Sequence, residues 1–385
     1  MPMAPLAEVA VTGDGDTRYY VHIAQHLAST GEYAQWNLRA YMPPGYPFFL
    51  SRLLLLGADS RVLQIAQNVL YLLAVLIVVV FAVRQGERRV GVLVGVLALL
   101  SPNWLLLPQK AMSETLFLIL LAVGLVLVFA RITLLGIGRA LSAGVIFGLA
   151  GLVREVAVPL AMALALVVGV WVGRTYCLRR GVALGVALLI GTGLAIVPWT
   201  ARNYTIFGEI VPIALNGPIN LYIGNNPRAT GIYEWRLPPA AQAVWNQPDE
   251  GWSKELFAAR LAGREAVKYI RENPRNAVAL MPRKIATLWG PPVALHPGHD
   301  LGALVRDGMA LAWFAALSLG VAGLWMMRHQ PLGWFIAGAC IMATGLHAVT
   351  FGDVRFRAPL EYLLMLPAGL AAATLWERIR PHARP

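Results

Sequence analysis

Charged residues are scarce in this chain, and their scarcity excludes an ordinary soluble protein. Only 14% of the 385 residues are charged, whereas 58% are hydrophobic. An average soluble domain has roughly 25% charged and about 45–50% apolar residues. The composition predicts an all-α polytopic membrane protein, because a helix satisfies its own backbone hydrogen bonds inside a bilayer.

Acidic residues and cysteines are also few. The 20 acidic residues are outnumbered by 32 basic ones, which gives a net charge of +12. The basic residues are dispersed between apolar runs and form no stripe, so the excess does not indicate a nucleic-acid partner. The two cysteines, Cys177 and Cys340, offer neither a disulfide framework nor the spacing of a zinc site.

The amino terminus lacks a basic segment followed by an apolar one. Residues 1–13 are therefore predicted to form neither a signal peptide nor a membrane span. A span needs about 20 predominantly apolar residues. The runs that we expect to cross the membrane are 62–83, 90–107 (interrupted by Ser101-Pro102-Asn103), 114–130, 141–153, 155–172, 181–199, 301–327, 332–351 and 359–376.

The short connections between these runs carry a charge bias that predicts their orientation. Segments 84–89, 131–139, 174–180, 328–330 and 377–385 hold twelve basic residues against two acids, Glu87 and Glu377. All five segments fall on one side if residues 141–172 form a hairpin. Basic residues collect in short cytoplasmic loops, so this side is predicted to be cytoplasmic. The turns 108–113 and 352–358 and the long polar segment then lie outside.

The charge pattern divides the chain into four expected parts. Residues 1–61 form an outer loop with interfacial helices, and residues 62–199 form a transmembrane bundle. Residues 200–300 form an extracytoplasmic segment with amphipathic stretches at 253–270 and 276–289. Residues 301–385 hold the last transmembrane helices and a cytoplasmic tail.

Several ionisable residues fall at the outer ends of apolar runs. Charges that gather at one boundary of a bilayer indicate a site. Those on the predicted outer side are Asp14, Asp16, Lys110, Glu114, Arg202, Asp353, Arg355 and Arg357.

Asp14 and Asp16 lie on a glycine-rich turn before a short helix. Two such carboxylates could supply a general base or bind a divalent cation. The alternative is a solvated turn in which Asp16 is the helix N-cap. His22 and His26 are four residues apart and could share a metal, but without a third ligand we favour two interfacial histidines.

Glu114 and Arg154 are the charged residues closest to long apolar sequence. Glu114 begins an expected helix, where a carboxylate can also serve only to complement the helix dipole. Arg154 interrupts apolar sequence on both sides. We expect its guanidinium to face a cavity and a partner, either a carboxylate near Glu155 or a phosphate.

Arg355 and Arg357 lie two residues apart in a short outer turn. Basic residues are disfavoured in such a turn as mere membrane anchors. We therefore expect the two guanidinium groups to form a fork for phosphate oxygens.

These motifs together resemble the GT-C superfamily of integral membrane glycosyltransferases. The resemblance is to the protein O-mannosyltransferase and lipid A aminoarabinose transferase group, and to its bacterial branch with an RgtA/B/C/D-like domain. It covers nearly the whole chain in order. The matching positions are Asp16, Tyr20, Ala24, 31–33, 43–47, 113–117, 148–154, 198–199, 202–204, 207–208, 224–227, 230–231 and 355–359.

The resemblance implies a polyprenyl-phosphate sugar donor and a lipid, glycan or protein acceptor at the outer face of a bacterial inner membrane. The family's essential aspartate maps onto Asp16, with Asp14 as the competing candidate, and its outer-loop glutamate maps onto Glu114. Arg355 and Arg357 are implied near the donor phosphate. Lys110, Arg154 and Arg202 are further candidates for binding that phosphate. A divalent cation is possible, but the sequence fixes no ligand set.

One feature departs from the family. Its members begin with a transmembrane helix that delivers the aspartate loop, and we expect that helix to be missing before Asp14. The alternative function is a non-enzymatic transporter or flippase of lipid-linked sugars. Such a protein would need polar residues through both halves of the bilayer, whereas this sequence concentrates them outside.

Overall fold

A computed structural model describes residues 15–34, 38–85, 88–101, 107–245, 254–291 and 303–379. Helices make up most of the described chain. They are α2 (Gly15–Thr30), α3 (Gly45–Leu55), α4 (Ser60–Arg84), α5 (Arg88–Leu100), η1 (Leu107–Gln109), α7 (Glu114–Phe129), η2 (Ile132–Leu134), α8 (Ile137–Val153), α9 (Ala157–Thr175), α10 (Leu178–Phe207), α11 (Asn216–Gly224), α12 (Pro239–Trp245), α13 (Lys254–Glu272), α14 (Pro274–Trp289), α15 (Ala303–Met326), α16 (Pro331–Val349), η4 (Val354–Arg357) and α17 (Ala358–Ile379).

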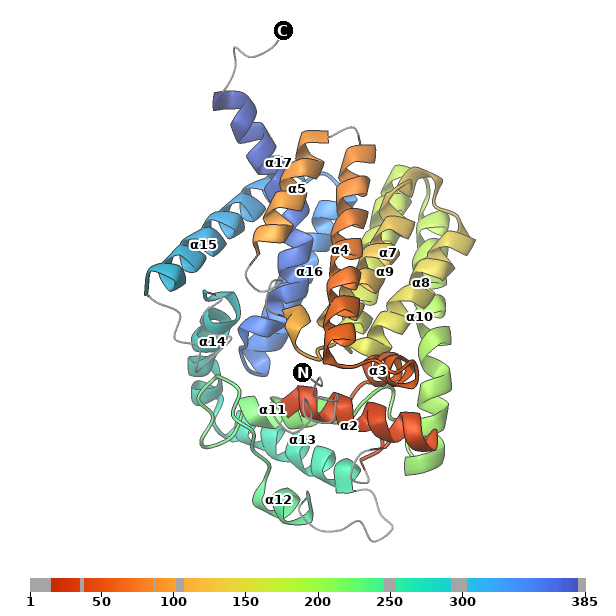
Figure 1. Cartoon of the computed structure of the whole chain (residues 1–385), viewed down its shortest axis with the longest axis vertical. Helices are drawn as coiled ribbons and strands as arrows, with labels where there is room; N and C mark the ends of the chain where they lie inside the picture. Colours follow the sequence, from red (N-terminus) through yellow and green to blue (C-terminus); the bar gives the residue numbers. More distant parts are fainter. Residues whose placement is uncertain are drawn as a thin grey trace.

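Long apolar helices form a bundle (Figure 1). Among the described residues, six helices are long and apolar enough to cross a membrane, namely α4, α9, α10, α15, α16 and α17 with its preceding turn, and α7 and α8 are shorter apolar helices. Large hydrophobic side chains on the bundle remain exposed, which is the arrangement expected where lipid replaces water; examples are Leu72, Leu166, Val186, Leu311 and Ile341. The chain is a multi-pass, all-α membrane protein, as its composition predicts.

Glycines let α8 and α10 approach each other closely. A Cβ atom at Gly144 of α8 would overlap the carbonyl of Leu188 in α10, and one at Gly191 of α10 would overlap the carbonyl of Leu141 in α8. Small residues of this kind allow helices to pack in a bilayer, where helix contact is not driven by the hydrophobic effect. Replacing either glycine would therefore push the two helices apart.

The expected hairpin over residues 141–172 is present. α8 ends at Val153, α9 begins at Ala157, and Arg154 lies in the turn between them rather than within an apolar helix. This turn, the start of α7 and the connection from α16 to α17 all lie at the lower end of the bundle in Figure 1, which we call the site end.

The expected span 90–107 differs from the observed helix. α5 ends at Leu100, and Leu107 already belongs to the separate 3₁₀ helix η1. Pro102 accounts for the difference, because a proline pushes the preceding residue, Ser101, out of the helical region.

Shorter helices cover the site end. Figure 1 shows α2, α3, α11 and α13 running across the lower end of the bundle, with α12 below them. α13 begins and ends close to the amphipathic stretch expected at 253–270, and it buries its alanine-rich face at Ala258, Ala259, Ala262 and Ala266. The layer thus lies over the ends of the transmembrane helices, where the ionisable residues gather.

Candidate active site

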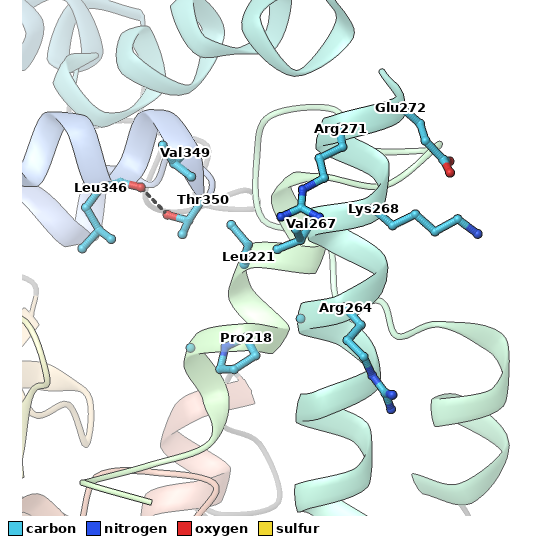
Figure 2. Close-up of a pocket in the computed structure, with 12 residues that line it drawn as sticks. Pro218, Leu221, Arg264, Val267, Lys268, Arg271, Glu272, Leu346, Val349 and Thr350 are labelled. Atoms are coloured by element: carbon cyan, nitrogen blue, oxygen red, sulfur yellow. Dashed lines mark hydrogen bonds between the residues drawn. The ribbon is translucent and has the colours of Figure 1, made fainter. Parts of the chain in front are cut away.

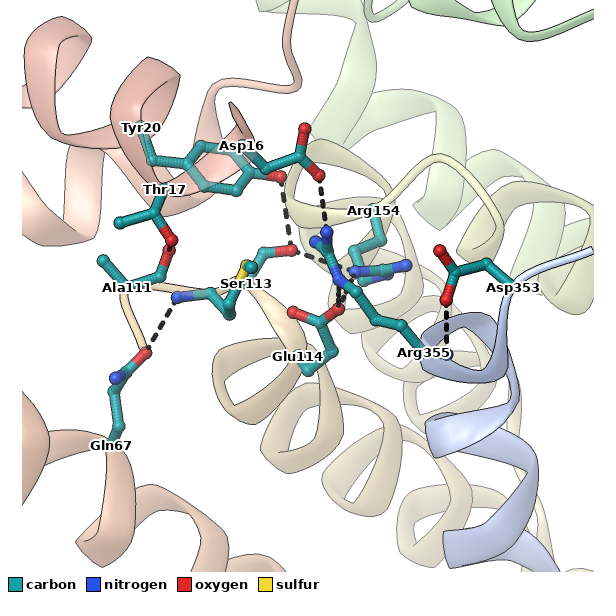
Figure 3. Close-up of polar contacts among 11 residues, drawn as sticks. Asp16, Thr17, Tyr20, Gln67, Ala111, Ser113, Glu114, Arg154, Asp353 and Arg355 are labelled. Carbon is teal, nitrogen blue, oxygen red and sulfur yellow. Dashed lines mark hydrogen bonds and ion pairs between the residues drawn. The ribbon is translucent and has the colours of Figure 1, made fainter. Parts of the chain in front are cut away.

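Four charged residues from distant parts of the chain meet at the site end. Asp16 comes from the first turn of α2, Glu114 begins α7, Arg154 lies in the α8–α9 turn and Arg355 belongs to η4. Figure 3 shows the Arg355 guanidinium between the carboxylates of Asp16 and Glu114, with Arg154 beside it. We call these four residues the charge cluster.

Glu114 holds both arginines of the charge cluster. One carboxylate oxygen, Oε1, accepts a hydrogen bond from Nε of Arg355 and lies 2.8 Å from a terminal nitrogen of Arg154. A terminal nitrogen of Arg355 also donates to Oδ2 of Asp16 at 2.6 Å. Hydrogen bonds between charged groups are stronger than neutral ones, so the arginines are held in one orientation.

Burial differs sharply between the two carboxylates. The Glu114 side chain is fully buried, whereas 37% of the Asp16 side chain remains exposed. The second carboxylate oxygen of Glu114, Oε2, is buried and has no hydrogen-bond partner among the described residues. Glu114 is therefore suited to holding charge in place, whereas Asp16 is open to a ligand on its free side.

Ser113 and Tyr20 extend the charge cluster. The Ser113 side chain does not cap α7; its hydroxyl oxygen accepts hydrogen bonds from Arg154 at 3.2 Å and from the Tyr20 hydroxyl at 3.4 Å. Burial raises the pKa of Tyr20 to about 12, so the phenol keeps its proton at neutral pH. Tyr20 thereby acts as a hydrogen-bond donor beside the acids.

Gln67 of α4 fixes the turn that carries Ser113 and Glu114. Its side-chain amide nitrogen donates to the carbonyls of Pro108 and Lys110 at 2.9 and 2.8 Å. Its oxygen accepts from the Tyr46 hydroxyl at 2.6 Å and from the backbone N–H of Met112 at 3.3 Å. A fully buried amide with all these partners makes the position of the turn well defined.

The turn that carries Arg355 is anchored in a similar way. Gly352 pairs with the segment at Ile232 through a short parallel bridge, and its N–H donates to the carbonyl of Gly231 at 3.1 Å. The Asp353 carboxylate then accepts the backbone N–H of Arg355 at 2.9 Å. Burial raises the pKa of the Asp353 carboxyl.

Arg357 does not form the expected fork with Arg355. It is fully buried and donates to Glu361 at 2.5 Å and to the carbonyl oxygens of Leu288 and Gly290, while its guanidinium lies 3.9 Å from the ring centroid of Trp313. Successive residues of a 3₁₀ helix are about 120° apart, so positions i and i+2 point in different directions. The shared-fork expectation is wrong for this turn.

Arg154 also has a different partner from the carboxylate expected near Glu155. Among the described residues, its ion pair is with Glu114, forty residues earlier in the chain. Arg202 lies over the rings of Trp199 and Tyr33 and donates to the carbonyls of Arg39 and Tyr33, so its described contacts do not include the charge cluster.

The remaining candidates are placed as follows. Asp14 lies outside the described residues, and Asp16 is the second residue of α2 rather than its N-cap. Lys110 lies three residues before Ser113, and its carbonyl is held by Gln67. In the described part of the chain, no group of three His, Cys, Asp or Glu residues could hold a metal ion, and this includes the surroundings of His22 and His26.

Two residues of the site were not predicted from the sequence. Tyr46 lies in the motif 43–47, and Gln67 lies in the apolar run 62–83, but neither was expected to have a role of its own. A signal for Gln67 did exist, because an amide in a membrane-spanning helix needs a hydrogen-bond partner. The sequence could not identify that partner, since it is the backbone of a turn more than forty residues away.

The similarity of this chain to known proteins is one of structure rather than of sequence. No protein-family model and no curated protein matches the chain. Among solved structures, the Archaeoglobus fulgidus oligosaccharyltransferase, tethered to an acceptor peptide containing the NVT sequon through a disulfide bond, matches 98% of this chain with a TM-score of 0.54 and 13% sequence identity. The chain therefore shares the fold of this oligosaccharyltransferase over nearly its whole length.

The match covers 49% of the oligosaccharyltransferase, so this chain spans about half the length of that protein. ArnT from Cupriavidus metallidurans also matches, in the apo state with a TM-score of 0.42 and 18% identity over 96% of this chain and 75% of ArnT. Its complex with undecaprenyl phosphate gives 0.43 and 16% over 98% and 79%. At 13% identity the likeness to the oligosaccharyltransferase shows the fold alone, and an activity has to be inferred from the site.

Proposed function

We propose that the chain is a membrane glycosyltransferase that moves a sugar from a polyprenyl-phosphate donor to a lipid, glycan or protein acceptor. The observation that carries this proposal is the Asp16–Arg355–Glu114 ion-pair network at one end of a GT-C bundle. Glycosyl transfer needs a base near the incoming nucleophile and positive charge where the leaving phosphate develops its negative charge. The charge cluster contains both kinds of group.

Each member of the charge cluster has a distinct part in the proposed reaction. The acceptor hydroxyl attacks the anomeric carbon of the sugar and gives its proton to Asp16, whose carboxylate is partly exposed. The bond from that carbon to the phosphate oxygen breaks, and the lipid phosphate leaves with the bonding electrons. Arg355 and Arg154 stabilise its charge, and Glu114 keeps the two guanidinium groups in place.

The ion pair between Asp16 and Arg355 implies that the donor binds before Asp16 acts as the base. The two carboxylates and two guanidinium groups of the charge cluster balance, so an entering phosphate has to compete with a carboxylate for an arginine. Asp16 is the carboxylate that can yield, because it is the more exposed and has a single ion-pair partner among the described residues. Donor binding would then release Asp16 to act as the base.

Aromatic side chains beside Asp16 suit a sugar substrate. Tyr19 packs on Tyr41 at a centroid distance of 5.2 Å, and Tyr41 in turn contacts Trp235 and Trp245. Burial is the main cause of the raised pKa values of Tyr19 and Tyr41, and the negative charge of Asp16 adds to both increases. Aromatic faces provide large rigid surfaces for the apolar face of a sugar ring.

The distribution of buried polar groups favours an enzyme over a transporter or flippase. Within the described residues, most buried polar side chains of the transmembrane helices lie near the site end, as Gln67, Glu114, His347 and Glu361 do. Thr192 is a buried polar residue in the middle of α10, and its hydroxyl bonds to the helix backbone. A transport route would need polar groups through both halves of the bilayer.

The test is glycan profiling in a deletion strain complemented with variants. Loss of the gene should remove one sugar from an envelope glycan or lipid, and the wild-type chain should restore it. We expect Asp16→Asn to lower transfer by about 100-fold or more, because general base catalysis contributes about 10²–10⁴-fold. Asp307→Asn, which changes an exposed carboxylate on α15, is the matched control and should restore the sugar.

Two results would contradict this proposal. Full restoration by Asp16→Asn would remove the assigned base. Accumulation of an untransferred lipid-linked sugar on one leaflet, with transfer itself intact in detergent, would instead indicate the flippase.

A further inference from the structure

A groove lies at the site end, apart from the charge cluster. It encloses about 820 Å³ between α11, α13 and the last turn of α16. Its floor is apolar and includes Pro218 and Leu221 of α11 and Leu346 and Val349 of α16, while its rim on α13 is basic. Figure 2 shows these three elements around the groove. We call it the basic groove.

The walls of the basic groove are fixed to each other. A Cβ atom at Gly224 would overlap the carbonyl of Thr350, so only glycine lets the end of α11 touch the end of α16. Asn225 donates to the carbonyl of Val349 at 2.7 Å, and the buried Lys284 of α14 donates to Asn225 at 3.3 Å and to the same carbonyl at 3.2 Å. The sequence motif at 224–227 thus builds one wall of a preformed site.

The basic rim carries charge that is not used within the described structure. Arg264, Lys268 and Arg271 follow one face of α13 at spacings of four and three residues. None of them has an ion-pair partner among the described residues, whereas Arg260 on the same helix pairs with Glu209. In Figure 2 the Arg271 side chain lies beside Val267 and Leu221, whereas the Lys268 and Arg264 side chains extend away from α11 and α16. Glu272 is the acid among the lining residues.

The location specifies the environment of the ligand. Leu346 and Val349 belong to the last turn of α16, which is long and apolar enough to span the membrane. The groove therefore opens at the level where lipid headgroups meet the hydrocarbon core. Both residues are 42% exposed, so the floor offers apolar surface that bilayer chains can cover.

We propose that the basic groove binds an anionic phospholipid of the surrounding leaflet. Its phosphate is held by Arg271, with Lys268 and Arg264 adding to the local positive field, and the upper part of an acyl chain lies over Leu221, Leu346 and Val349. The rim charge selects an anionic over a zwitterionic headgroup. The apolar floor selects a lipid over a free phosphate. The bound lipid would fix α13 against the membrane, whether or not the chain transfers sugars.

Native mass spectrometry of the purified full chain, with phosphatidylglycerol or phosphatidylcholine added in detergent, tests the proposal. The wild type should retain phosphatidylglycerol preferentially. The triple variant R264Q/K268Q/R271Q should bind it about 100-fold more weakly, at about fivefold for each charge near a headgroup. The matched control R52Q/R228Q/R283Q removes three exposed arginines that do not line the groove, and it should bind as the wild type does.

A second variant tests the floor without changing any charge. Leu346→Trp adds bulk to a half-exposed side chain that lines the groove, and it should weaken retention of phosphatidylglycerol while leaving the melting temperature close to that of the wild type. Soluble glycerol phosphate should not compete with phosphatidylglycerol for the wild-type protein.

Three outcomes would overturn the proposal. The rim triple could retain phosphatidylglycerol as strongly as the wild type, or the control triple could lose as much binding as the rim triple. Polyprenyl phosphate could also displace phosphatidylglycerol in a manner that depends on the rim, which would assign the groove to a donor lipid instead. Each readout is binding rather than turnover, so a negative result here leaves the proposed transfer reaction untouched.

Discussion

Arg355 and Arg357 stand two residues apart in the same turn, yet they occupy different surroundings. Arg355 connects three segments, and one of its partners, Asp16, keeps 37% of its side chain exposed. Arg357 is enclosed by Glu361, by backbone carbonyls at the end of α14 and by the Trp313 ring. Arg357 is fully buried, 15% of the Arg355 side chain is exposed, and both arginines pair with acids. The difference lies in whether a ligand could reach an acid partner, and this is what separates a site from a structural ion pair.

The largest expected effect is the loss of stability when the buried ion pair between Arg357 and Glu361 is broken. Arg357→Met would remove the ion pair of the buried Glu361 carboxylate, and breaking such a pair costs about 3–5 kcal/mol of stability. We expect a much lower yield of monodisperse protein in size-exclusion chromatography. The double variant Arg357→Met/Glu361→Leu removes both charges and should recover most of that yield. If the single variant were as stable as the wild type but inactive, Arg357 would belong to the active site after all.

Arg355 should show the opposite pattern. Arg355→Gln removes a donor from the proposed leaving-phosphate site, so transfer should fall by about 100-fold or more. Stability should fall less than in Arg357→Met, because Glu114 keeps its ion pair with Arg154 and Asp16 can turn to solvent. Thermal unfolding and a transfer assay on the same preparations measure the two effects. A collapse of the fold equal to that of Arg357→Met would make the charge cluster structural and would abolish the comparison.

Gln67 tests whether the position of the charge cluster depends on its supporting turn. Gln67→Leu should cost about 1–3 kcal/mol, because the Tyr46 hydroxyl and two carbonyls lose a buried partner. We expect transfer to fall by about tenfold through displacement of Glu114. Adding Tyr46→Phe should recover part of the stability but not the activity. Recovery of both would mean that Gln67 acts only through packing.

The smallest expected effect is a pH dependence of stability, and it arises from Lys284, a buried amine that can titrate. Burial lowers its pKa from 10.5 to about 8. Between these values the unfolded chain binds a proton that the folded chain does not, so this residue makes folding more favourable as the pH rises. The melting temperature of the wild type relative to Lys284→Met should therefore increase from pH 8 toward pH 10. A constant difference would show that the ammonium is stabilised as well inside the protein as in water.

Much of the fold was predictable because its signal is local. Apolar runs specify transmembrane helices one segment at a time, so the expected positions of α4, α9, α10 and α16 agree with the structure to within a few residues, although α10 continues to Phe207. Arg154, which interrupts apolar sequence on both sides, indicated the turn of the hairpin between α8 and α9. In the expected run 90–107, which Ser101-Pro102-Asn103 interrupts, α5 ends at Leu100, just before that interruption.

The sequence identified candidate residues for the site, but it did not predict how their side chains are arranged. Sequence position placed Asp16, Glu114 and Arg355 at the ends of apolar runs, which identified them as functional candidates. The shared fork failed because residues i and i+2 face the same way in an extended segment but not in a 3₁₀ turn. Spacing alone does not distinguish these backbones. For the same reason Arg154 was assigned a neighbour in sequence, whereas its partner is Glu114.

Hydrophobicity by itself determined that this chain is a membrane protein and which segments form its long helices. The reason is that each helix needs only its own residues to satisfy its backbone hydrogen bonds in lipid. Tertiary packing alone decided that a residue near the amino terminus pairs with one 339 positions later, and that a second arginine of the same turn points elsewhere. A charge in a low-dielectric environment takes whichever counter-charge the packing of the backbone brings within reach, and no pattern along the chain encodes that choice.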